Sequence, residues 1–217
     1  MMRRVFVAVL LAAIGSATRA SAAPFTNGSF ELGSVDPGVY QTLGVGSTAI
    51  TGWEVIGSNI DYVGSFWQAS DGSRSLDLNG NSGPGGIRQT FDTVAGQQYA
   101  VIMDIAAHHP PGHDRFALRI DLNGVISSVG FGPDPGSTRD DMRWNSGLFV
   151  AGWVTATSDH MTLSIFSETN DPVYGPAIDN VRIVTPDDVF PPAAVPEPTT
   201  LSLLGLGLVG IAVRRFR

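Results

Sequence analysis

Short strand-like runs, separated by turn-forming residues, recur along the middle of this chain and constrain its fold more than any other feature. Glycine, proline, asparagine and aspartate bound the runs, at a spacing typical of sandwiches and barrels. The runs that we expect to form strands cover residues 52–56, 59–63, 74–78, 86–91, 98–106, 115–122, 125–129, 147–155, 160–167 and 177–184. No amphipathic helix of useful length interrupts them, so the middle of the chain is predicted to be all-β.

Alternation within two of these runs indicates which side of each strand is buried. The large apolar side chains of the run 115–122 fall on one side, at Phe116, Leu118, Ile120 and Leu122. The run 160–167 alternates in the same way, and Asn123-Gly124 tolerates the positive φ of a tight hairpin turn. These patterns predict an antiparallel sandwich of two sheets.

The charge and residue composition exclude several classes of function. The chain has a net charge of −7 and 13 basic residues, of which six lie close to the two ends. The middle is therefore strongly acidic, which repels nucleic acid and suits divalent cations or neutral glycans. Because there is no cysteine, disulfides, thiolate metal sites and a cysteine nucleophile are excluded.

The first 22 residues have the three parts of a secretion signal. Arg3 and Arg4 precede a short apolar stretch at 5–14, and Ala20-Ser21-Ala22 supplies a small-residue cleavage site. The apolar stretch is too short for a stable transmembrane helix, although an uncleaved anchor is the alternative. We therefore expect the middle domain to be exported.

The C-terminal end carries a proline-rich linker, an apolar stretch at 201–213 and a closing arginine cluster. This arrangement resembles the PEP-CTERM sorting domain, and the residues that carry the likeness are Pro196, Glu197, Pro198, Arg214 and Arg215. The resemblance implies processing by an exosortase, transient attachment to the membrane, and display by a Gram-negative bacterium that makes exopolysaccharide. A plain tail anchor is the alternative. The predicted organisation is a signal-peptide helix (1–22), a β domain (23–186), a linker (187–195) and a sorting segment with a hydrophobic helix (196–217).

Several segments of the middle domain resemble galactose-binding-type jelly rolls, and in particular the choice-of-anchor C family of exported bacterial proteins. They are 27–31 at the start, 52–55, the long run 60–78, 86–91, and 178–181 near the end. The resemblance implies a jelly-roll sandwich related to carbohydrate-binding modules, without a known ligand.

A structural calcium ion is one expectation that this resemblance carries. In similar jelly rolls a glutamate of the opening strand and an aspartate of the closing strand hold calcium, and Glu31 and Asp179 match these positions. Asp179 also shares strand parity with Val181 and Ile183, which predicts a core-facing carboxylate that needs a partner. The alternatives are a hydrogen-bonded aspartate and a pair with arginine.

Two of the four tryptophans lie in polar surroundings that suit stacking on a sugar ring. Trp67 is close to Asp71, and Trp144 follows Arg143, so these four residues are the predicted glycan-binding set. Core packing is the alternative for each tryptophan, and we expect it for Trp53 and Trp153. The histidine-rich segment 108–114 is predicted to be an exposed loop, with transition-metal binding as the alternative.

No catalytic residue is predicted, because the chain lacks the motifs of nucleophile elbows, zinc-protease helices and phosphate loops. Adjacent acids such as Asp140-Asp141 are typical of a solvated loop. The first hypothesis is a non-catalytic surface or matrix protein that binds extracellular polysaccharide. A structural cell-surface or biofilm protein without a glycan ligand is the second, and a glycoside hydrolase the third.

Overall fold

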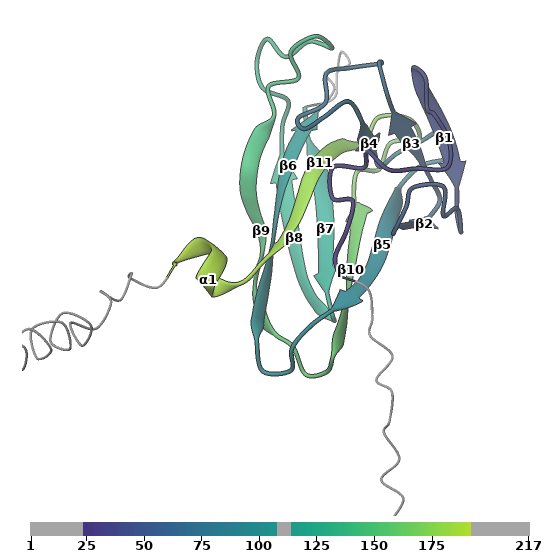
Figure 1. Ribbon diagram of the computed structural model, residues 1–217. Coiled ribbons are helices and arrows are strands. Elements are labelled where there is room, and N and C mark those ends of the chain that lie inside the picture. Colours follow the sequence, from purple (N-terminus) through teal and green to yellow (C-terminus); the bar gives the residue numbers. More distant parts are fainter. Residues whose placement is uncertain (1–23, 108–113, 192–217) are drawn as a thin grey trace, which may run out of the picture. The chain divides into compact units, whose positions relative to one another are not determined.

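The computed structural model describes residues 24–107 and 114–191 and contains eleven strands (Figure 1). They are β1 (Tyr40–Gly44), β2 (Glu54–Gly57), β3 (Asn59–Val63), β4 (Ser75–Asp77), β5 (Gly85–Asp92), β6 (Gln98–Ala107), β7 (Phe116–Leu122), β8 (Val125–Phe131), β9 (Asn145–Thr155), β10 (His160–Ser167) and β11 (Pro176–Val184). All ten expected strands are present, with ends within about two residues of the predicted ones. Only β1 was not predicted, because Leu43 is its single buried side chain and no alternation marks it.

The strands form two antiparallel sheets that face each other. The six-stranded sheet has the order β1-β3-β4-β11-β6-β9, and the five-stranded sheet has the order β2-β5-β10-β7-β8. The chain passes repeatedly from one sheet to the other, as in jelly rolls. The predicted fold class, an all-β jelly-roll sandwich, is confirmed.

The main hydrophobic core lies between the two sheets. The predicted alternation is confirmed, since Leu118, Ile120 and Leu122 of β7 and Leu163 and Ile165 of β10 are all 0% exposed. A two-residue turn joins β7 to β8, with φ of 52° and 88° at its two residues, as the Asn-Gly pair predicts.

A second, smaller cluster covers part of the other side of the six-stranded sheet, which we call its outer face. In β3, Ile60 and Tyr62 belong to the main core, whereas Val63 belongs to the second cluster. The remaining members of this cluster are Trp67, Ala106, Met142 and Ala177, with Phe66 and Trp144 packed against them. Loop residues from 64–74 and 132–144 therefore bury the outer face that a simple sandwich would expose to water.

A β-bulge in β11 changes the face on which Asp179 lies. The register of β11 against β6 shifts between Asp179 and Arg182, and Asn180 has a φ of 48°. As a result Ile178 and Val181 both face the main core, whereas Asp179 lies on the outer face, opposite Asp104 of β6. The expectation that Asp179 shares a core-facing side with Val181 is wrong for this reason, although Asp179 is fully buried.

Beyond the last strand, the segment from Thr185 forms a separate unit. A one-turn helix, α1 (Pro186–Val189), occupies part of the predicted linker, and the carboxylate of Asp188 accepts hydrogen bonds from the N–H and hydroxyl of Thr185. No helix in residues 24–107 or 114–191 combines the length and hydropathy needed to cross a membrane. The predicted signal peptide, residues 108–113 of the histidine-rich segment and the sorting segment lie outside the described residues.

Candidate functional site

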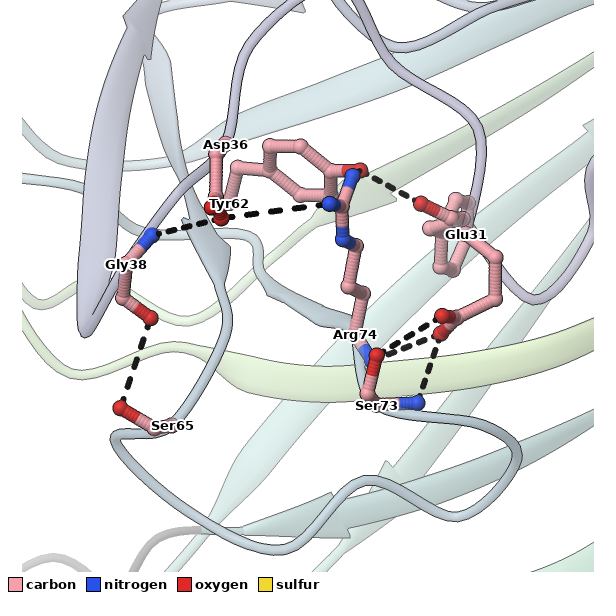
Figure 2. A network of polar contacts seen from close by, with 8 residues as sticks. Glu31, Asp36, Gly38, Tyr62, Ser65, Ser73 and Arg74 are labelled. Carbon is pink, nitrogen blue, oxygen red and sulfur yellow. Dashed lines mark hydrogen bonds and ion pairs between the residues drawn. The ribbon is translucent and has the colours of Figure 1, made fainter.

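The loop between β3 and β4, residues 64–74, lies over the outer face, and we call it the cover loop. Glu31 fixes its end: the Oε1 atom accepts the N–H groups of Ser73 and Arg74 at 2.8 and 2.7 Å, and Oε2 accepts the Ser73 hydroxyl at 2.9 Å (Figure 2). The Arg74 side chain points away from Glu31 and donates to the Tyr62 hydroxyl, which itself donates to the carbonyl of Phe30. The cover loop is thus held by charged and polar groups of the sandwich.

Asp179 holds the middle of the cover loop. Its Oδ2 atom accepts the N–H groups of Ser70 and Asp71 at 2.8 and 2.9 Å, and its Oδ1 atom accepts the N–H of Asn180 at 2.7 Å. Asp104, which faces Asp179 across the strands, accepts the Ser70 hydroxyl at 2.6 Å. Glu31 and Asp179 therefore bind the same loop through neighbouring residues.

Burial dominates the ionisation of Asp179. Loss of water raises its pKa from 3.8 to about 7, and the three backbone N–H groups that it accepts act in the opposite direction. The free-energy cost of ionising this carboxylate in the folded protein is therefore large.

Hydrogen-bond donors surround Glu31 and Asp179, the two residues of the predicted calcium site. The partners given above for Glu31 and Asp179 are N–H and O–H donors, which compete with a cation for the same lone pairs. Within residues 24–107 and 114–191, no group of three or more His, Cys, Asp or Glu side chains could hold a metal ion. This geometry fits hydrogen bonding rather than coordination, and calcium at Glu31 and Asp179 stays a prediction.

Next to the cover loop, the outer face contains a cavity of about 190 Å³, which we call the outer cavity. Two carboxylates line it, Asp61 of β3 and Asp77 of β4, which are direct partners across the two strands. The other lining residues are Tyr40, Val63, Phe66, Trp67, Arg139, Val173 and Tyr174. The cavity thus combines paired acids with four aromatic side chains and one cation, which is typical of a binding site.

Both acids of the outer cavity are harder to ionise than an ordinary aspartate. Burial raises the pKa of Asp61, and a 2.5 Å hydrogen bond from the Thr42 hydroxyl partly offsets this effect. Burial raises the pKa of Asp77 well above its usual value, and the negative charge of Asp61 adds to the rise. Opposed like charges on neighbouring strands destabilise a sheet, which makes this pair a candidate for function.

Aromatic contacts connect the wall of the outer cavity to the cover loop. Tyr40 of β1 meets Phe66 edge to face at a centroid distance of 5.3 Å, and Phe66 meets Trp67 at 5.5 Å. The guanidinium of Arg139 lies 3.9 Å from the centre of the Phe66 ring. Because Phe66 and Trp67 belong to the cover loop, its anchors on Glu31 and Asp179 also position the cavity wall.

The structure places the four residues that were predicted to bind glycan in different environments. Trp67 is only 5% exposed and its indole N–H donates to the Ser75 hydroxyl at 2.8 Å, so it is not an open stacking surface. Trp144 and Arg143 line a second cavity at the end of β6, where Arg143 pairs with Asp134 at 3.1 Å. Asp71 is exposed, and its backbone N–H is the group that binds Asp179.

The other two tryptophans differ from each other. Trp53 is 2% exposed in the main core, as expected. Trp153 is half-buried and meets the exposed ring of Phe149 edge to face at 5.5 Å, outside the buried core clusters. The expectation that Trp153 packs in the core is wrong, because β9 is an edge strand with irregular register.

Sequence reasoning missed the acids of the outer cavity, although the signal was present. Asp61 alternates with Ile60 and Tyr62, so it must point away from the main core. Acids at matching positions of neighbouring strands indicate that this face of the sheet has a function beyond contact with water. That the cover loop buries this face could not be read from the alternation.

The fold and the C-terminal motif define an exported β-sandwich protein with a sorting signal. The PEP-CTERM protein-sorting motif matches residues 194–217, which indicates export and display at the cell surface. The chain belongs to the family described as "Protein of unknown function (DUF642)", whose model matches residues 23–184. Halomucin of Haloquadratum walsbyi is 34% identical over 188 residues, which are 85% of this chain. The chain spans about 2% of that protein's length.

Solved structures with a similar strand arrangement include carbohydrate-binding modules and a phage protein. TmCBM61, solved with β-1,4-galactotriose, is 14% identical with a TM-score of 0.42, over 76% of this chain and 99% of its own. A family 35 module from Clostridium thermocellum is 16% identical with a TM-score of 0.44, over 66% and 97%. The enzymatically active domain of tailspike protein 4 from bacteriophage CBA120 is 15% identical with a TM-score of 0.41, over 76% and 21%. This likeness concerns the fold alone.

The raised pKa of Asp179 predicts that acidification stabilises the domain. The folded-state value of about 7 lies above the unfolded value of 3.8, so the folded protein binds more protons between these limits. The free energy of unfolding should therefore fall by roughly 4 kcal/mol as pH rises from about 4 through about 7. Urea unfolding at a series of pH values measures this slope.

Two variants serve as controls for that slope. Asp179→Asn should be less stable, since an amide offers one acceptor oxygen in place of two, and its stability should depend less on pH. Asp140→Asn, which removes an exposed carboxylate, should retain the slope. A stability that rises with pH across this window in the unchanged protein would contradict the prediction.

Chelation separates hydrogen bonding from calcium binding at Glu31 and Asp179. If both carboxylates only accept hydrogen bonds from their N–H and O–H donors, EDTA leaves the melting temperature unchanged. Asp179→Ala should still destabilise the domain by about 3 kcal/mol, because it leaves buried donors without an acceptor. A melting temperature that falls with EDTA in the unchanged protein but not in Asp179→Ala would instead support the calcium site.

Proposed function

We propose that this protein is an exported, non-catalytic surface or matrix protein that binds extracellular polysaccharide through the outer cavity. The observation that carries the proposal is that aromatic side chains, the buried carboxylate of Asp77 and the half-buried carboxylate of Asp61 line one cavity on an otherwise covered sheet face. The cell surface is where such a ligand would be encountered.

The chemistry of the outer cavity matches that of a sugar ring. A pyranose presents an apolar face, which stacks on aromatic rings, and a rim of hydroxyl groups, which need hydrogen-bond partners. Tyr40 and Phe66 supply ring surface, while Asp61, Asp77 and Arg139 supply acceptors and donors. Tyr40 is 49% exposed, so its ring is accessible from solvent.

A glycoside hydrolase is the second candidate for the same pair of acids. A glycosidase needs one protonated and one ionised carboxyl group, which requires environments that move the two pKa values apart. Burial raises the pKa of both acids, and it raises the pKa of Asp77 further than that of Asp61. Turnover of a glycan that is lost on substitution of either acid would favour hydrolysis over binding alone.

The tail leads to a proposal about sorting. An exosortase processes the precursor at the PEP-CTERM segment, so that the apolar stretch anchors the protein in the membrane only until the tail is removed. As part of the same proposal, the host is a Gram-negative bacterium and the β domain is similar to the choice-of-anchor C family.

Retardation in polysaccharide gels tests the binding function. The purified protein should be slowed by at least one of a panel of bacterial and plant polysaccharides, and Tyr40→Ala should weaken the effect about tenfold, as expected for the loss of one stacked ring. Phe149→Ala is the matched control, since Phe149 is 43% exposed on the other edge of the same sheet and also meets one aromatic ring. Free migration through every gel would favour a structural matrix protein.

Substitution of the tail motif tests sorting in the native host. Replacement of Pro196, Glu197 and Pro198 by alanine should leave an unprocessed, membrane-retained precursor, detected by the larger size of the protein in the membrane fraction. Replacement of the adjacent Thr199 and Thr200 is the control and should be processed normally. Normal processing of the first variant would contradict exosortase recognition.

A further inference from the structure

The two carboxylates of the outer cavity have acceptor capacity that the described protein does not use. A carboxylate offers about four lone-pair positions. Asp77 is only 7% exposed, and its carboxylate accepts the backbone N–H groups of Asn79, at 2.9 Å, and Gly175. Asp61 accepts a single hydroxyl, that of Thr42. Lone pairs of both residues thus remain for a donor that enters the cavity.

Burial disfavours the ionised form of both acids, and like charges add to this effect at Asp77. Asp61 and Asp77 face each other across the strands, and the charges that act on Asp77 are those of Asp61 and Asp171. In the described part of the chain, neither Asp61 nor Asp77 forms an ion pair with arginine or histidine. Arg139 lines the same cavity, where its guanidinium lies against the Phe66 ring. A cation that enters the cavity would therefore stabilise the ionised form of both acids.

We propose that the outer cavity selects sugar residues that carry a free ammonium group, as in a hexosamine polymer that is not N-acetylated. This inference rests on the proposed polysaccharide-binding function and adds the class of sugar. An ammonium group has three N–H donors on a compact charge, which matches the open acceptor positions of Asp61 and Asp77. The apolar face of the same sugar stacks on the aromatic wall, which a bare metal ion would leave unused.

Other sugar classes fit this site less well. An N-acetyl group removes the positive charge and two of the three donors, and it adds bulk over the two acids. A uronate would bring a third carboxylate beside Asp61 and Asp77 and raise the cost of burial. A neutral sugar satisfies the acceptors through hydroxyl groups but brings no positive charge to stabilise the ionised acids.

A comparison of two oligosaccharides that differ only in acetylation tests the inference. Calorimetry would compare glucosamine and N-acetylglucosamine oligomers of equal length with the purified protein, at a pH where the sugar amine is protonated. We expect the amine form to bind at least tenfold more tightly. Asp77→Asn and Asp61→Asn should each reduce this preference about tenfold, whereas Asp92→Asn, which removes an acid from the other sheet, should retain it.

The outcomes separate this inference from the function on which it rests. Equal or tighter binding of the acetylated oligomer, or of a neutral polysaccharide, would overturn the amino-sugar selectivity and leave polysaccharide binding intact. Absence of binding to every glycan would overturn both. A preference for the amine that persists in both aspartate variants would reject the outer cavity as its source. If Asp77→Asn does not fold, the comparison of Asp61→Asn with the unchanged protein still tests the inference, because Asp61 is only half-buried.

Discussion

The carboxylate of Asp179 organises the outer face of the six-stranded sheet. Its hydrogen bonds to the backbone of Ser70 and Asp71 hold the cover loop against strands that would otherwise face water. Phe66 and Trp67 on this loop complete the second hydrophobic cluster and the wall of the outer cavity. Asp179 is costly to bury, but its hydrogen bonds hold the cover loop in place. The outer cavity therefore depends on Asp179, although Asp179 does not line it.

Burial on both sides changes the role of polar residues in the six-stranded sheet. Asp61, Asp77, Asp104 and Asp179 all lie on the outer face, where a solvated sheet would carry ordinary surface acids. Because loops cover this face, each acid needs hydrogen-bond donors, and each finds them in backbone N–H or side-chain donor groups. Where those donors do not use the full capacity of the acids, at Asp61 and Asp77, acceptor positions remain open to the outer cavity.

The strands and the inner core could be read from the sequence because alternation fixes the buried side of each strand, as in 115–122 and 160–167. The position of Asp179 could not be read from the sequence. A bulge at Asn180 shifts the alternation of buried and exposed side chains by one residue, and the sequence pattern does not show it. The outer cavity was also missed, because it depends on how two long loops fold back, which is a matter of tertiary contacts. The polar residues around Trp67 led to the prediction that its ring is exposed. In the structure Ser70 donates to Asp179, and the indole N–H of Trp67 donates to Ser75, so the ring is buried beneath the cover loop.

The place of β11 in the sheet bears on how the chain leaves the cell. β11 is the last strand of the sandwich, yet it lies between β4 and β6 near the centre of the six-stranded sheet. A polypeptide that is threaded through a membrane from its N-terminus delivers this strand last, so the sheet has a gap until residue 184 has emerged. Pairing of β11 with β4 and β6 joins segments that are distant in the chain, and such contacts form slowly. The six-stranded sheet is therefore completed only when almost the whole domain has been delivered.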